Sequence, residues 1–169
     1  MEFTIKAGRH YANKMLRMRI MWGNTLSFKF KISASAQYDP SGLLNGYSKI
    51  FGMAEPFGHC NSCRLVFVST GDQLKFGVYV YRKGVSPQED TTLKKDLCIM
   101  IPKQEYTCKI IRYFDHYNIW ITVNNYMVGN ASMPAGRWPL PFRFLLHPYI
   151  GGRFTLDKDV TIDITRIKS

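Results

Sequence analysis

Acidic side chains are few in this sequence, and their spacing does not suit the chemistry that paired carboxylates perform. Hydrolysis of a glycosidic bond needs two carboxyl groups that flank the bond. Glu55 and Glu105 each stand alone beside turn residues. Asp157, Asp159 and Asp163 share one parity, so they would face one side of a strand, but no Glu lies near them. The sequence therefore disfavours a retaining glycoside hydrolase.

Elimination chemistry on an acidic polysaccharide needs a different set of side chains. It requires a base, often His or Tyr, and an Arg or Asn that neutralises the carboxylate of the sugar. The sequence holds residues of these types at His59, Asn61, Arg64, Tyr81 and Arg112. No spacing ties them together, so a polysaccharide lyase stays an alternative.

The four cysteines do not form a convincing metal site. His59, Cys60 and Cys63 would supply three ligands, whereas a structural zinc ion takes four, usually from two paired knuckles. We therefore expect no metal and no cofactor. Cys98 and Cys108 flank the same turn, where either a disulfide across a hairpin or two buried thiols would fit.

Aromatic residues give the clearest indication of a binding surface. Tyr79, Tyr81 and Trp120 alternate with aliphatic residues, which places them on the outer faces of their strands. Flat rings next to Arg and Asn suit sugars, since the ring covers C–H faces while the polar neighbours pair with hydroxyls. Alternatively, loops cover these rings and make them a second layer of core. The candidate ligand-binding residues are Tyr79, Tyr81, Trp120, Arg64, Asn61, His59 and Arg112.

The elements that would position these residues are strands, because apolar and polar residues alternate nearly everywhere. The period is two over residues 26–32, 74–80, 117–123 and 160–164, with turn residues between the runs. The predicted inward residues are Phe28, Phe30, Phe76, Val78, Ile119, Ile121, Ile162 and Ile164. A helix is indicated only weakly, over residues 11–18. The pattern predicts an all-β, two-sheet antiparallel jelly-roll sandwich.

Length and charge narrow the possible partners. The 169 residues, without a linker or a repeat, predict one domain over residues 1–169. The formal net charge of +11 favours anionic partners. No module that binds nucleic acid is recognisable, and the basic residues of 14–19 alternate as in a charged edge strand. No run of 18 apolar residues is present, so we expect no membrane-spanning segment.

Several segments, taken in order, resemble one family. They are residues 7–11, 26–30, 48–52, 59–64, 78–81, 147–152 and 159–162. Together they look like small secreted Bacteroidetes proteins with a concanavalin A-like (laminin G-like) jelly-roll fold. This chain departs from the family's pattern at Cys63-Arg64, where an Ala-Arg pair is usual, and at residues 157–159, where a Pro-His-Asp run is common. The resemblance implies the fold and export from the cytoplasm.

These observations favour a non-catalytic, lectin-like protein that binds an acidic glycan at the cell surface or in the periplasm. One alternative is an enzyme on acidic polysaccharide, either a lyase or a hydrolase. Another is a structural or adhesion module whose partner is a protein. If a glycan is bound, salt should weaken the binding without abolishing it, and Trp120→Ala should remove the remainder.

Overall fold

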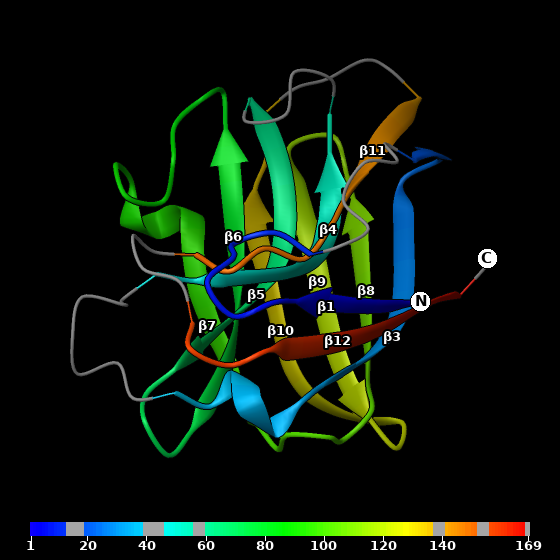
Figure 1. The fold of residues 1–169 in the computed structure, drawn as a ribbon. Coiled ribbons are helices and arrows are strands. Elements are labelled where there is room, and N and C mark those ends of the chain that lie inside the picture. Colours follow the sequence, from blue (N-terminus) through cyan, green and yellow to red (C-terminus); the bar gives the residue numbers. More distant parts are fainter. Residues whose placement is uncertain (13–18, 39–45, 56–59, 137–140, 152–155, 168–169) are drawn as a thin grey trace.

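The computed structural model describes residues 1–12, 19–38, 46–55, 60–136, 141–151 and 156–167, whose strands form two six-stranded antiparallel sheets (Figure 1). In spatial order, sheet A contains β1 (Glu2–Ile5), β12 (Val160–Ile167), β3 (Thr25–Ile32), β8 (Tyr106–Arg112), β9 (His116–Val123) and β10 (Tyr126–Pro134). Sheet B contains β2 (Ile20–Trp22), β11 (Phe142–Leu146), β4 (Ser48–Ala54), β5 (Asn61–Ser69), β6 (Leu74–Arg82) and β7 (Lys94–Met100). The predicted all-β sandwich is confirmed.

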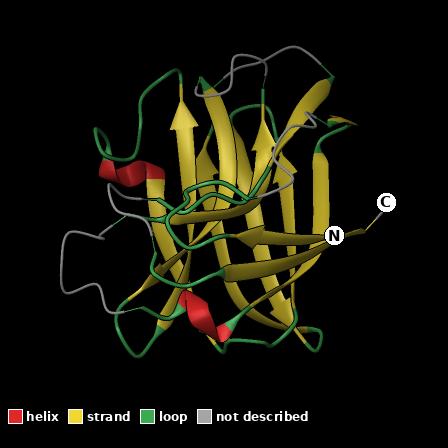
Figure 2. Cartoon of the chain, viewed as in Figure 1, coloured by secondary structure: helices red, strands yellow, loops and turns green. Residues whose placement is uncertain are grey.

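Helical structure in the described residues is limited to two short 3-10 turns, η1 (Ala34–Ala36) and η2 (Thr91–Leu93) (Figure 2). The side chain of Asp90 accepts a hydrogen bond from the Thr92 amide and so caps η2. No helix in this part of the chain is long and apolar enough to cross a bilayer. The helix predicted over 11–18 and the charged strand predicted over 14–19 fall mainly on residues 13–18, outside the described residues.

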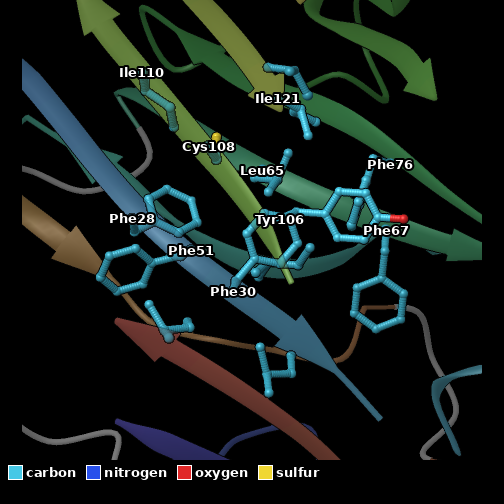
Figure 3. Packing of buried hydrophobic residues seen from close by; sticks show 14 of the residues in the cluster. Phe28, Phe30, Phe51, Leu65, Phe67, Phe76, Tyr106, Cys108, Ile110 and Ile121 are labelled. Atoms are coloured by element: carbon cyan, nitrogen blue, oxygen red, sulfur yellow. The ribbon is translucent and has the colours of Figure 1, made fainter. Parts of the chain in front are cut away.

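The core lies between the sheets and is rich in phenylalanine (Figure 3). All eight residues predicted to point inward are at most 1% exposed. Rings from opposite sheets meet edge to face: Phe28 of β3 lies 5.1 Å from Phe51 of β4, and Phe30 lies 5.0 Å from Phe76 of β6. Because such ring pairs and the burial of apolar surface both favour association, these contacts hold the two sheets together.

All four cysteines are free. Cys98 belongs to β7 of sheet B and Cys108 to β8 of sheet A, so the turn between them joins two sheets and is not the tip of a hairpin. Burial raises the pKa of the Cys98 thiol to about 11 and that of Cys108 well above its usual range. Cys108 therefore packs as a small apolar residue in the core, and the partly buried Cys98 packs against it.

Candidate functional site

A pocket of about 440 Å³ opens on the outer face of sheet B. Its floor is made by side chains of neighbouring strands that alternate with core residues. Its walls come from Tyr11, from the loop before η2, which contributes Gln88, and from the end of β11 with the segment that follows it. The lining residues are Tyr11, Lys49, Arg64, Tyr79, Tyr81, Gln88, Leu145, Leu146, His147, Pro148 and Tyr149. The alternation along each strand therefore assembles a surface that no single segment contains.

Arg64 lines the pocket on β5, the strand between β4 and β6. It pairs with Tyr79 on one side and with Gly52 on the other. A Cβ at position 52 would come within 2.7 Å of Arg64 Cα, which real Cβ atoms do not tolerate. Glycine is therefore required at position 52 if β4 is to pair this closely beside Arg64.

Two cations share the pocket. The ammonium group of Lys49 lies over the rings of Tyr79 and Tyr149, at 5.1 and 5.2 Å from their centroids. Burial, and then repulsion by Arg64, lowers the pKa of Lys49 to about 8. Burial also lowers the pKa of Arg64, whose buried Nε finds no hydrogen-bond acceptor among the described residues. Among the residues that line the pocket, none is Asp or Glu, so the described site holds uncompensated positive charge.

The tyrosines form the apolar part of the same pocket. The Tyr79 hydroxyl donates a hydrogen bond of 2.6 Å to Gln88 Oε1, and its ring lies 5.6 Å from the ring of Tyr81. On the other wall, Tyr11 meets Tyr149 edge to face at 4.8 Å. Burial raises the pKa of Tyr79, so its phenol stays neutral near pH 7. The rings thus offer flat, uncharged surfaces beside two cations.

The pocket brings together three of the predicted ligand-binding residues, Arg64, Tyr79 and Tyr81. Tyr81 is half-buried, whereas Tyr79 is only 3% exposed, so the alternative of a second-layer core describes Tyr79 in part. Asn61 lies elsewhere: it is buried, and its Oδ1 accepts a hydrogen bond from the amide of Lys83.

The other predicted ligand-binding residues are not part of the pocket. Trp120 is half-buried on the outer face of sheet A, where Lys109 and Asn130 are its cross-strand neighbours. It therefore lies on the sheet opposite to the pocket. His59 lies outside the described residues. The predicted ligand-binding residues that the structure describes therefore do not form a single site.

Arg112 lies in the protein interior, where a surface ligand does not reach it. Its Nε donates to Glu55 Oε1 at 3.0 Å, its Nη2 donates to the carbonyl of Gly136, and its guanidinium lies 5.1 Å from the centre of the Tyr117 ring. Both partners of this ion pair are almost completely buried. Glu55, which seemed isolated in sequence, is thus the partner of Arg112, and this pair serves the fold.

Sequence reasoning missed Lys49, Gln88 and Tyr149 as site residues. Lys49 and Tyr149 form an isolated bridge to each other, and a β-bulge follows Lys49 in its pairing with β5. A bulge shifts the face on which a residue lies, and the alternation of residue types does not reveal it. A usable signal was nonetheless present, because Lys49 and Tyr149 both fall in segments that carry the family resemblance.

Metal binding finds no support in the described residues. No three His, Cys, Asp or Glu side chains gather there as potential ligands. Cys63 is completely buried in the core, whereas Cys60 is exposed. The two thiols therefore do not converge in the way that a zinc knuckle requires.

Comparisons with known proteins identify the fold. No known family model matches the sequence, and no curated protein sequence is similar to it. Among solved structures, an alginate lyase from Klebsiella pneumoniae aligns with a TM-score of 0.52 at 9% identity, over 86% of this chain and 60% of that chain. A glycosyl hydrolase family 16 protein from Mycobacterium smegmatis aligns with a TM-score of 0.51 at 10% identity, over 98% of this chain and 74% of its own. A carbohydrate-binding module, CBM66 from Bacillus subtilis, aligns at 0.43 and 10% identity, over 96% and 83%.

The chain has the concanavalin A-like jelly-roll fold, which it shares with this alginate lyase and with the family 16 glycosyl hydrolase protein. The fold implied by the sequence resemblance is therefore confirmed. The comparisons assign neither the family of small secreted Bacteroidetes proteins nor a taxon. At this identity the likeness concerns the fold alone, because one fold carries many functions. The chain also spans only about 60% of the length of the Klebsiella enzyme.

Proposed function

We propose that this protein binds an acidic glycan in the pocket on sheet B, without cleaving it. The observation that carries the proposal is the pair of cations, Lys49 and Arg64, in a partly buried pocket whose described lining contains no carboxylate. Placing like charges together away from water is unfavourable, so a bound anion would relieve a cost already present in the fold.

A uronate sugar carries a carboxylate and an apolar ring face, which would complement the cations and the tyrosine rings of this pocket. Its carboxylate would accept hydrogen bonds from the Arg64 guanidinium, which lines the pocket. Its ring would place C–H groups against the faces of Tyr81 or Tyr149, which are partly exposed. The shared fold with carbohydrate-active proteins supports a carbohydrate partner without identifying it.

A polysaccharide lyase is the second candidate, because one observation favours it. With a pKa of about 8, Lys49 would be partly deprotonated near neutral pH and would serve as a base beside Arg64, which would neutralise the uronate carboxylate. However, the residues that the sequence suggested for a lyase do not come together. Arg112 is buried in the interior, and the Asn61 side chain accepts a hydrogen bond from the amide of Lys83. Binding is therefore the function that the geometry supports best.

The test is to compare two variants that remove the same charge from neighbouring strands. Arg64→Gln changes the pocket, whereas Arg82→Gln changes an exposed arginine at the end of β6 outside the pocket lining. Binding to polygalacturonate, alginate and hyaluronan, with a neutral glucan as control, is measured by calorimetry. We expect Arg64→Gln to weaken binding of the acidic polymer at least about tenfold and Arg82→Gln less than about twofold. Equal losses would mean that only net charge attracts the polymer.

Two further measurements separate the alternatives. Incubation with the same polymers, followed at the absorbance of unsaturated sugar ends, detects a lyase; we expect no increase. A glycan array distinguishes a sugar-binding protein from an adhesion module with a protein partner, which would bind no glycan. Export to the cell surface or periplasm remains a part of the proposal that rests on the sequence resemblance, and fractionation of the producing cell tests it.

A further inference from the structure

An apolar strip leaves the pocket along β11. Phe142, Phe144 and Leu146 alternate with Arg143 and Leu145, which are buried, so the first three point to the outer face of sheet B and are partly exposed. Leu146 is itself a pocket residue. The strip is thus continuous with the site described above, on the same face of the same sheet.

The far end of the strip is an exposed tryptophan on the edge strand β2. Trp22 pairs with Phe142 in the sheet register, and the two rings meet edge to face at 6.0 Å. Phe142 in turn lies 6.0 Å from Phe144. Trp22 is 71% exposed, and its strand neighbour on the same face, Ile20, is 53% exposed. Large apolar side chains left open in a contiguous row indicate a contact surface more often than an isolated exposed ring does.

The dimensions of the strip suit a chain of linked sugars. Residues 142 to 146 extend over about 13 Å along a strand, and Trp22 adds the width of a further strand, about 5 Å. This reach is longer than one sugar ring. None of the five outward side chains from Trp22 to Leu146 is charged. Contacts along the strip therefore come from ring faces and not from ion pairs.

From this arrangement we infer that the glycan held at Lys49 and Arg64 continues along β11 and stacks on Trp22, so that the protein recognises an extended stretch of polymer. The inference rests on the proposed function. The choice of occupant follows from the continuity of the strip with the pocket and from its chemistry, since sugar rings present C–H faces that pack on aromatic rings. A second copy of this chain is the competing occupant, because β2 is a sheet edge.

The experiment varies the length of the ligand and the aromatic residue together. Disaccharides and hexasaccharides of galacturonate, mannuronate and hyaluronan are titrated against the wild-type protein, Trp22→Ala and Tyr126→Ala. Tyr126 is the matched control, since it is 77% exposed on β10, the edge strand of sheet A. We expect Trp22→Ala to weaken hexasaccharide binding about five- to tenfold and to leave disaccharide binding unchanged. Tyr126→Ala should change neither.

Each outcome decides between the two proposals. If the wild-type protein binds none of these oligosaccharides, the proposed function fails and the inference fails with it. If the protein binds them but Trp22→Ala has no effect, or the same effect on both lengths, only the inference is overturned. If sedimentation shows that Trp22→Ala dissociates a dimer while hexasaccharide binding is unchanged, the strip is an interface between copies, which also overturns the inference. Trp22→Phe should retain most of the hexasaccharide affinity, provided that stacking is the cause.

Discussion

Lys49 is the residue through which pH should control the pocket. It faces Arg64 of β5, Tyr79 of β6 and Tyr149 beyond β11. Arg64 stays charged, and burial raises the pKa of both tyrosines, so Lys49 is the group that changes charge near its pKa of about 8. We expect affinity for an acidic polymer to fall between about pH 7 and about pH 9, because the neutral amine no longer attracts a carboxylate.

Lys49→Arg is the control for this pH dependence, since an arginine stays protonated and should flatten the profile. Stability should respond in the opposite direction. The pKa of Lys49 in the folded protein lies below its ordinary value of 10.5, so the unfolded chain binds more protons between these two values. The free energy of unfolding from this group therefore rises with pH above about 8. A binding profile that is flat in the wild-type protein would exclude Lys49 as a ligand contact.

The ion pair between Arg112 and Glu55 should matter for stability and not for binding. Arg112→Met leaves a buried carboxylate without its main partner, which typically costs about 3–5 kcal/mol. Lys29→Met is the matched control, because it breaks a pair with Glu105 whose side chains are 48% and 54% exposed. Such surface pairs contribute about 0–1 kcal/mol. Urea unfolding measures both changes, and similar losses would mean that the two pairs contribute alike.

At the scale of the element, the faces of β3 and β6 decide which residues build the core. Phe28 and Phe76 are completely buried between the sheets. Replacing either by Ala should cost about 3–5 kcal/mol, since it removes packing and leaves a cavity. Lys75, the partly exposed neighbour of Phe76 on the opposite face, gives the control, and Lys75→Ala should change stability by less than about 0.5 kcal/mol. If both substitutions lowered the free energy of unfolding by less than about 1 kcal/mol, the assignment of buried and exposed faces to these strands would be wrong.

At the scale of the whole molecule, the net charge of +11 should make part of the binding sensitive to salt. Raising salt to about 0.5 M shortens the Debye length to under about 5 Å, so long-range attraction fades while ring contacts remain. Because Trp120 lies on sheet A, away from the pocket, we expect the salt-resistant part of the binding to come from the rings of the pocket. We therefore expect Tyr81→Ala to reduce salt-resistant binding and Trp120→Ala to leave it intact. The reverse result would restore the expectation drawn from the sequence.

The sequence by itself determined the strands β3, β6, β9 and β12 and their buried faces. Alternation along each run is a local property, set by the pleat of a strand, so Phe28, Phe76 and Ile162 are identifiable as core without knowledge of the partner strand. The same locality explains why Tyr79 and Tyr81 were correctly placed on the outer faces of their strands.

Only the tertiary structure decided which strands share a sheet, and therefore which outward-facing residues lie on one common surface. Trp120 and Tyr81 have equivalent local patterns, yet their strands belong to different sheets. The partners of Glu55 and Lys49 are likewise distant in sequence, and a bulge fixes the orientation of Lys49. Strand order and bulges depend on the packing of the whole sandwich, because pairing energies are similar for many registers until the core selects one. The positions of the pocket and of the strip along β11 follow from that selection.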